Sequence, residues 1–409
     1  MLILDNATLV DLKAGVLNPG ASVVIDGAEI VSVESARPGE RDARRIDLRG
    51  RTLLPGLIDA HFHAMLTDLN LGNLRGVPLT LLTARACQLL RATLDRGFTT
   101  VRDMGGADWG LRQAVTEGVL SGPRLFISGR ALSQTGGHGD FRLRTDEENL
   151  CSCANGLSLV SVVADGRDGV RTSVREQLRQ GVDQIKVFLS GGVASPSDPL
   201  TSSQYSDEEL LAIVAEASAW GTYVAAHAYT AEAISRAARA GVRTIEHGNL
   251  IDATAARELA NAGGYMVPTL ITYEALRRES SRAQLSEFSR KKLAHVLDAG
   301  MKSIEIAVSH GIKLGFGTDL LGEFHPYQAE ELVLRSRVQG AAAVLDSATR
   351  INAEILGQPG RLGVVAPGAI ADLIAVAGNP LQNLDLLQHQ GRHIDLIVKG
   401  GRLHKNRCE

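Results

Sequence analysis

Residues 55–63 read Pro-Gly-Leu-Ile-Asp-Ala-His-Phe-His, an apolar run that ends in two histidines. In an extended chain alternate side chains point to the same side, so His61 and His63 can both reach one metal ion. Two histidines at this spacing are by themselves more often structural than functional. Their meaning therefore depends on the residues that follow the other predicted strands.

The middle of the chain alternates apolar β-like runs with amphipathic helical stretches, the pattern of a parallel sheet with crossover helices. Helical patterns cover residues 79–96, 169–180, 207–219 and 231–240. The predicted strands are residues 53–59, 98–103, 124–128, 184–189, 222–227, 243–247, 265–270 and 312–318. Eight parallel strands predict an α/β fold, a (β/α)8 TIM barrel.

Both ends of the chain are predicted to be β structure. Short runs rich in β-branched residues cover 2–10, 21–33, 46–53, 371–376 and 395–399, and Asp26-Gly27 is a hairpin turn signal. We expect the two ends to pair into one small β-sandwich. The predicted domains are the N-terminal part of the sandwich at 1–54, the barrel at 55–355 and the C-terminal part of the sandwich at 356–409.

Composition places the chain among ordinary globular proteins. Of its 409 residues 44% are hydrophobic and 22% charged, and the formal net charge is −3. This charge favours a small-molecule partner over nucleic acid, and no run is long enough to span a bilayer. The first residues do not resemble a signal peptide, so we expect a cytoplasmic location with free thiols at the four cysteines, which are Cys87, Cys151, Cys153 and Cys408.

Potential metal ligands occur at the ends of the predicted strands, where a barrel carries its catalytic groups. Strand one ends in the histidine pair, and further candidates follow or lie in strands four, five, six and eight. These candidates are Lys186, His227, His247 and Asp319. Each additional match would have to be a separate coincidence, so the six residues together predict a metal centre.

Lys186 lies inside an apolar run, where a lysine is rare unless it is paired. If its amine has reacted with carbon dioxide, the resulting carbamate can bridge two divalent ions. The carbamate, Asp319 and a bridging hydroxide supply three negative charges, so the two divalent metal ions would keep one net positive charge. Zinc is the leading candidate for both ions, and manganese or cobalt would also fit. A single ion with an unmodified lysine is the alternative.

Asp319 is predicted to bind a metal, to accept the proton of the attacking water and to pass it to the leaving group. Its alternative reading is the N-cap of a helix after Gly317-Thr318.

The motifs resemble the amidohydrolase superfamily, in the subtype with two metals bridged by a carboxylated lysine. The resemblance rests on residues 55–63, 245–248 (Ile-Glu-His-Gly), 317–319 (Gly-Thr-Asp) and 367–373 (Pro-Gly-Ala-Ile-Ala-Asp-Leu), and it spans almost the whole chain. It implies that His61 and His63 hold the more buried ion, and that His227 and His247 hold the second.

Three further segments look like the branch that contains Xaa-Pro dipeptidases, related carboxypeptidases and ochratoxin-hydrolysing amidases. They are residues 136–140 (Gly-Gly-His-Gly-Asp), 185–193 and 226–229 (Ala-His-Ala-Tyr). This resemblance implies that His138 contacts the scissile carbonyl or its oxyanion and that Tyr229 donates to the substrate carboxylate. The alternatives are a loop histidine held by glycine turns and a tyrosine packed in the core.

The predicted function is metal-dependent hydrolysis of an amide whose leaving amino acid has a free carboxylate, by a metal-bridging hydroxide. Candidate substrates are Xaa-Pro dipeptides, N-acyl amino acids and ochratoxin A. A cyclic amide or a phosphotriester is the alternative substrate class, and an inactive scaffold is a third hypothesis. The resemblance also implies a homo-oligomer.

Two long predicted loops, 129–167 and 190–205, are expected to lie over the active site. Arg142 and Arg144 in the first can attract a carboxylate, and residues 146–157 match no family pattern.

Overall fold

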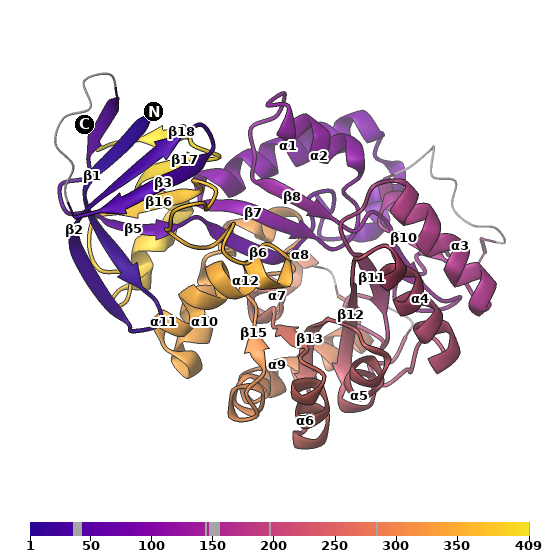
Figure 1. Ribbon diagram of the computed structural model, residues 1–409. Helices are drawn as coiled ribbons and strands as arrows, with labels where there is room; N and C mark the ends of the chain where they lie inside the picture. Colours follow the sequence, from indigo (N-terminus) through magenta and orange to yellow (C-terminus); the bar gives the residue numbers. More distant parts are fainter. Residues whose placement is uncertain (36–42, 144, 147–155, 196–197, 284, 409) are drawn as a thin grey trace.

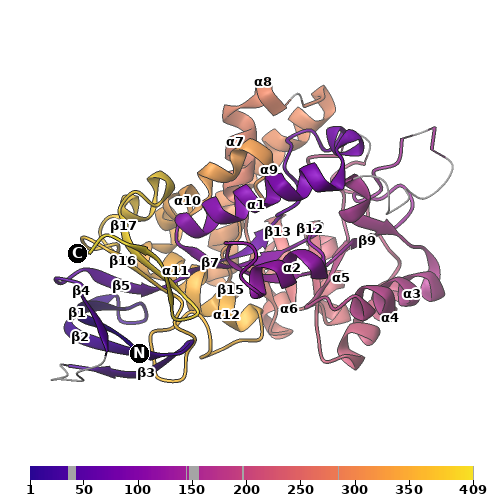
Figure 2. The same cartoon turned by 90° about the horizontal axis from the view of Figure 1, so that it is seen from above.

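The computed structural model describes residues 1–35, 43–143, 145–146, 156–195, 198–283 and 285–408. Strands from the two chain ends, indigo and yellow in Figure 1, lie together at one side of the molecule. Helices and parallel strands make up the rest, and the view from above shows the same division (Figure 2). Among the described residues, no helix is both long and apolar enough to cross a membrane.

The two ends of the chain share one eight-stranded sheet. Its order is β18-β17-β16-β5-β1-β2-β3, with β4 paired to β1. The ends meet where β5 pairs antiparallel with β16, so the predicted pairing is confirmed. The strands are β1 (Leu2–Asp11), β2 (Val16–Asp26), β3 (Glu29–Glu34), β4 (Arg44–Asp47), β5 (Thr52–Pro55), β16 (Leu373–Val376), β17 (Ile394–Lys399) and β18 (Arg402–Asn406).

Ten further strands form two sheets in which every pairing is parallel. The orders are β6-β7-β8 and β10-β9-β11-β12-β13-β14-β15. The strands are β6 (Leu57–Phe62), β7 (Phe98–Asp103), β8 (Arg124–Ile127), β9 (Ala131–Ser133), β10 (Ser161–Val163), β11 (Ile185–Phe188), β12 (Val224–Thr230), β13 (Thr244–Leu250), β14 (Tyr265–Val267) and β15 (Lys313–Leu314). All eight predicted apolar runs thus contain a parallel strand.

Backbone hydrogen bonds join the two parallel sheets at two places. Asp183 N, just before β11, donates to Ile127 O of β8 over 2.8 Å. At the second place, where the edge strands β6 and β15 lie, Ala60 N of β6 donates to Phe316 O, just after β15, also over 2.8 Å. Because every pairing in these two sheets is parallel, the carboxyl ends of the eight predicted strands lie on one side of the sheets.

Three predicted elements differ from the structure. The run 53–59 belongs to two strands, because the chain leaves the end sheet at Pro55 and enters the parallel sheet at Leu57. Gly56 between them lies so close to β7 that a Cβ would be 2.1 Å from Thr99 Oγ1. The run 312–318 forms a strand over two residues only, and the predicted loop 129–167 contains β9, β10 and a 3₁₀ helix, η2 (Gly156–Leu159).

Helices pack around the parallel strands, and the four helical predictions are confirmed to within three residues at each end. Helix α4 begins with a capping box, in which Ser206 Oγ accepts from Glu209 N and Glu209 Oε2 accepts from Ser206 N. The α-helices are α1 (Leu79–Asp95), α2 (Trp109–Thr116), α3 (Gly166–Arg179), α4 (Asp207–Ala219), α5 (Ala231–Ala240), α6 (Ala253–Asn261), α7 (Leu270–Arg278), α8 (Ser280–Ala283), α9 (Glu287–Ser309), α10 (Glu330–Gln339), α11 (Ala341–Asp346) and α12 (Asn352–Ile355).

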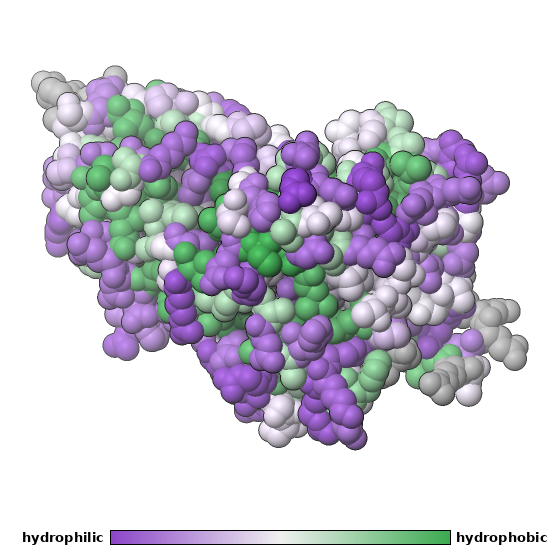
Figure 3. Space-filling view, turned by 90° about the horizontal axis from the view of Figure 1, so that it is seen from below, coloured by the Kyte–Doolittle hydropathy of each residue, from purple (hydrophilic) through white to green (hydrophobic). Residues whose placement is uncertain are grey.

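The surface mixes hydrophilic and hydrophobic residues. On the face shown in Figure 3, hydrophilic side chains dominate the outer parts and hydrophobic side chains gather toward the middle. Cys87 and Cys408 are free thiols, and Cys151 and Cys153 lie outside the described residues.

Candidate metal centre and substrate pocket

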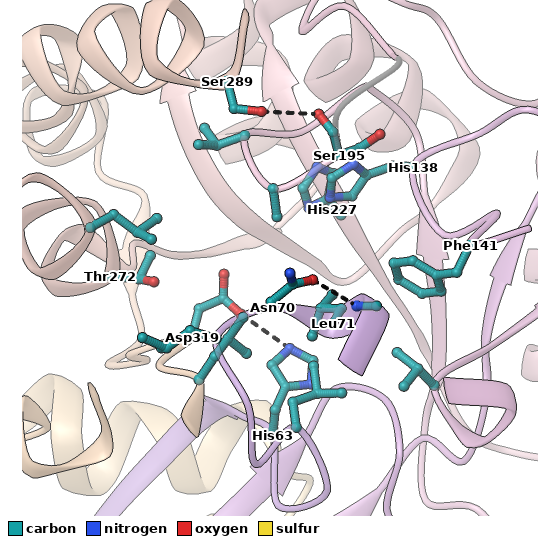
Figure 4. A pocket seen from close by; sticks show the side chains of 18 of the residues that line it. His63, Asn70, Leu71, His138, Phe141, Ser195, His227, Thr272, Ser289 and Asp319 are labelled. Carbon is teal, nitrogen blue, oxygen red and sulfur yellow. Dashed lines mark hydrogen bonds and ion pairs between the residues drawn. The ribbon is translucent and has the colours of Figure 1, made fainter. Parts of the chain in front are cut away.

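Predicted ligands from three different strand ends come together at the carboxyl side of the parallel sheets. His61, His247 and Asp319 offer ligand atoms that all lie within 4.8 Å of one another. Asp319 Oδ1 is 3.3 Å from His61 Nε2 and 3.1 Å from His63 Nε2, and Figure 4 shows the second contact. Burial alone would raise the pKa of Asp319, but these two histidines hold it well below its ordinary value.

A buried carboxylate fixes the orientation of His61. Glu246 Oε2 lies 2.8 Å from His61 Nδ1, and Glu246 Oε1 lies 2.8 Å from Arg102 Nη2. All three side chains are almost completely buried. A hydrogen bond at Nδ1 leaves Nε2 as the ligand atom, which faces Asp319. Metal-binding histidines usually have such a partner on their other ring nitrogen.

The other three histidines are oriented in the same way. His63 Nδ1 is 3.0 Å from Gly105 O, which leaves its Nε2 facing the site. His247 Nδ1 is 2.8 Å from Thr269 Oγ1, and His227 Nε2 is 3.2 Å from Gly191 O. Each imidazole therefore keeps one nitrogen free of these contacts, as metal ligation requires.

Asp59 ties the end of β6 to the turn that carries Asp319. Its carboxylate accepts from Thr318 Oγ1 (2.6 Å), Gln328 Nε2 (2.9 Å) and His61 N (3.0 Å). Asp319 itself has a φ of +52°, a left-handed conformation that non-glycine residues adopt infrequently. The hydrogen bonds from the neighbouring Thr318 hold this turn in place.

Lys186 lies in the middle of β11, where all four residues are buried. Its side chain lines the same cavity as the histidines and Asp319, with Nζ 5.9 Å from the centroid of the Phe188 ring. Burial lowers the pKa of Lys186 to about 8. A fraction of the amine is therefore neutral near physiological pH, and the neutral amine is the form that reacts with carbon dioxide.

The residues present suit divalent metal ions. Four imidazoles, each with one nitrogen left free, line the same cavity as a carboxylate whose pKa is lowered, and nitrogen and oxygen ligands of this kind favour zinc and its neighbours. The sequence-predicted ligand set therefore lies in one place.

The metal-ligand candidates form the floor of a cavity of about 610 Å³. Its outer wall is largely apolar, with Leu71, Phe141, Leu157, Leu276 and Leu285 among the lining residues. Two arginines also line it, but both are paired. These ion pairs are Arg142 with Asp140 and Arg75 with Asp146. Arg144 lies outside the described residues, as does most of the segment 146–157.

His138 stands beside the metal-ligand candidates on the loop after β9. Its ring stacks on that of His227 with centroids 4.6 Å apart, as the overlapping rings in Figure 4 show. Its Nδ1 is 3.3 Å from Asp198 Oδ2. Although burial opposes this, the His138 contact lowers the pKa of Asp198 to about 2, so the carboxylate stays charged. Nε2 of His138 is then the atom available to a ligand.

Tyr229 lines the cavity from the end of β12. Its hydroxyl is 2.7 Å from the hydroxyl of Tyr273, and its ring stacks on His247 with centroids 5.1 Å apart. Burial raises the pKa of Tyr229 well above its ordinary value, so the phenol stays protonated and can donate. Tyr229 thus lines the cavity and also packs in a buried cluster, and its contact with a substrate carboxylate stays a prediction.

Sequence reasoning did not assign roles to Glu246, Asp198, Thr269 or Tyr273. The signal for Glu246 was present, because a carboxylate beside His247 in a buried β-run needs a partner. Asp198 and Tyr273 follow strands four and seven at a distance along the chain. Their contacts depend on how loops fold back, which no local pattern encodes.

The Amidohydrolase family model matches residues 52–403, and the chain belongs to this family. Among particular relatives, the ochratoxinase of Aspergillus niger is 30% identical over 427 residues, which cover 98% of this chain and 88% of the relative. The crystal structure of an amidohydrolase is 49% identical with a TM-score of 0.97 and full coverage of both chains. That of a prolidase complexed with N-methylphosphonate-L-proline is 48% identical, with a TM-score of 0.96 and coverage of 99% and 100%.

These relatives confirm the family resemblance predicted from the sequence. The chain is a hydrolase enzyme, and its ochratoxinase and prolidase neighbours support hydrolysis of amide bonds.

Proposed function

We propose that this enzyme hydrolyses the amide bond of N-acyl amino acids, including Xaa-Pro dipeptides or ochratoxin-like amides, and that it requires a free carboxylate on the leaving amino acid. One observation carries the proposal. His138 and Tyr229, two side chains able to donate hydrogen bonds, line the same cavity as six potential metal ligands. A scissile carbonyl and a fixed carboxylate would thus each have a donor in reach of one reacting centre.

His61, His63, Lys186, His227, His247 and Asp319 would hold two divalent ions, of which zinc suits the ligands best. When bound, such ions would lower the pKa of a water molecule and would polarise the scissile carbonyl. Reaction of the neutral Lys186 amine with carbon dioxide would form an N–C bond, release one proton and give an anionic carbamate ligand. Asp319, ionised in its resting state, would accept the proton of the attacking water and pass it to the departing nitrogen.

His138 would donate from Nε2 to the oxygen of the scissile carbonyl as negative charge develops there. Its Nδ1 lies 3.3 Å from Asp198 Oδ2, and a proton on each ring nitrogen would let Nδ1 donate to that carboxylate while Nε2 donates to the substrate. Tyr229 would donate its hydroxyl hydrogen to the substrate carboxylate. A prolidase neighbour binds N-methylphosphonate-L-proline, in which an amino-acid carboxylate is likewise free.

The acyl group would lie against the apolar outer wall of the cavity. Because Arg75 and Arg142 are both held in ion pairs, the described part of this wall offers a neutral environment to the substrate. Leu71, Phe141 and Leu285 supply hydrophobic surface of the kind that lines most small-molecule sites. A bulky apolar acyl group is therefore the best match.

The parallel strands would close into a (β/α)8 barrel through the hydrogen bonds between the two parallel sheets, with the end sheet as the β-sandwich. The proposed domains are the two parts of the β-sandwich, at 1–54 and 356–409, and the barrel at 55–355. A homo-oligomer stays a prediction.

A substrate panel tests the proposal. N-acyl amino acids and Xaa-Pro dipeptides are compared with their carboxamides, before and after exhaustive chelation and zinc restoration. We expect hydrolysis of the free carboxylates only, loss on chelation and recovery with zinc. Equal rates on the carboxamides would refute the role of Tyr229, and activity on a cyclic amide or phosphotriester alone would refute the substrate class. Activity that survives metal removal would refute the metal centre.

A further inference from the structure

The loop after β11 touches three candidate site residues at once. We call residues 190–195 and 198 the strand-four loop. Gly191 O lies 3.2 Å from His227 Nε2, and Asp198 Oδ2 lies 3.3 Å from His138 Nδ1. Ser190 Oγ accepts from the backbone N of Tyr229 over 2.9 Å. The loop therefore contacts both donors and one ligand candidate, and its Gly192 and Asp198 are the part that touches His138.

His138 also rests directly on this loop. A Cβ on Gly192 would lie 2.2 Å from His138 Cε1, so only a glycine lets the ring approach so closely. Gly192 N in turn donates to Asp198 Oδ2 over 3.1 Å. A small shift of the loop would thus move the imidazole and its charged partner together.

Lys292, on helix α9, forms hydrogen bonds with the backbone of the strand-four loop. Its Nζ donates to three backbone carbonyls, which are Gly192 O at 2.5 Å, Ser195 O at 2.6 Å and Asp198 O at 3.0 Å. The side chain belongs to α9 and is 6% exposed. Ser289, three residues earlier on the same helix, donates to Ser195 O over 3.5 Å, as Figure 4 shows.

This arrangement uses the full donor capacity of one ammonium group. A buried lysine is costly unless its hydrogens are satisfied, and here all three have acceptors on a single short stretch of chain. The carbonyls converge on a point charge, and this geometry suits an ammonium better than a planar guanidinium. A residue that served only to pack α9 would need no such set of donors.

We propose that Lys292 is a positioning residue for catalysis, which fixes the strand-four loop so that His138 faces the scissile carbonyl. The inference rests on the function proposed above. Lys292 does not line the cavity, so it acts through His138 and not on the substrate. Misplacement of a catalytic group by about 1 Å can lower a rate about 100-fold.

The first test measures the loop itself. Lys292→Met keeps the aliphatic stem and removes the three donors, and Lys291→Met is the matched control on the same helix. Lys291 is exposed and pairs only with Glu287, over 2.9 Å, among the described residues. Amide hydrogen exchange of a peptide spanning residues 189–205 should become about tenfold faster in Lys292→Met and stay unchanged in the control.

The second test measures catalysis on the best substrate of the panel. We expect Lys292→Met to lower kcat about 100-fold with KM changed less than about threefold, while zinc content stays at the wild-type level. In a His138→Ala background the same substitution should cost no more than about threefold, because the residue it positions is gone. Lys291→Met should match the wild type in both backgrounds.

The outcomes separate the two proposals. Unchanged exchange in Lys292→Met, or faster exchange with unchanged kcat, would overturn the positioning role and leave the proposed function in place. A full loss in the His138→Ala background would also overturn it, because Lys292 would then act by another route. A wild-type enzyme that hydrolyses none of the panel would refute the proposed function, and with it the catalytic role of Lys292.

Discussion

Replacing Glu246 by glutamine tests the orientation of His61 at a single atom. Each oxygen of the carboxylate has its own hydrogen-bond partners. Oε2 bonds to His61 Nδ1, whereas Oε1 accepts from Arg102 Nη2 and, over 2.6 Å, from Thr244 Oγ1. An amide has one acceptor oxygen and one NH2 group. If the oxygen faces Arg102, the NH2 group donates to His61 Nδ1 and moves the imidazole hydrogen to Nε2, the atom that would bind metal.

The size of both effects follows from this geometry. Loss of the partner of a metal-binding histidine typically weakens metal affinity 10–100-fold, which corresponds to about 1.4–2.7 kcal/mol. Removing one member of a buried ion pair costs about 3–5 kcal/mol of stability. Because the amide oxygen can still accept from Arg102, we expect a loss near the lower limit, about 3 kcal/mol.

The assay has two parts. Metal-free protein is titrated with zinc against a chromogenic chelator, and the free energy of unfolding of the metal-free protein is measured with guanidinium chloride. Glu258→Gln is the control, since Glu258 forms an exposed pair with Arg239 at 3.1 Å, and such pairs contribute at most about 1 kcal/mol. Zinc affinity within about threefold of the wild type would refute the orienting role of Glu246.

Three further predictions concern single side chains. Lys186→Ala should lose most of its activity and recover part of it with bicarbonate and a short carboxylic acid, whereas a fully active variant would refute the carbamate bridge. Tyr229→Phe should lower the preference for free carboxylates over carboxamides about 10–100-fold, as expected for one hydrogen bond to a charged group, and an unchanged preference would argue against that bond. Burial raises the pKa of Glu331 from 4.5 to about 8, so the folded state binds its proton more tightly than the unfolded state does. The free energy of unfolding should therefore fall as pH rises from about 5 to 8. Urea unfolding at several pH values should show a larger fall in the wild type and in the Glu330→Gln control than in Glu331→Gln.

Sequence patterns predicted much of this fold because several of its parallel strands, among them β6, β7 and β11, are buried on both faces. Runs such as Phe98–Asp103 are rich in aromatic and β-branched residues and so stand out between amphipathic helices, and strand β7 has those same limits. The pattern could not show that the run 53–59 crosses from one sheet to another, since both halves are equally buried. Nor did it predict β9 and β10, whose three residues each are too short for a periodic signal.

The candidate site was predictable wherever its residues follow a strand. His227 and His247 lie in strands, so their place along the chain fixes their place in space. Asp198 and Lys292 instead meet through loop and helix packing, between segments far apart in sequence. Partners of this kind emerge only from the assembled structure.

The pairing of β5 with β16 also has a consequence for synthesis on the ribosome. The N-terminus leaves the ribosome first, so β1 to β5 are available long before Leu373 leaves the exit tunnel. Until then β5 presents an open edge, and unpaired edges promote association between nascent chains. Completion of the end sheet must wait for β16 to β18, so a chain that stops before Leu373 cannot pair β5 with β16.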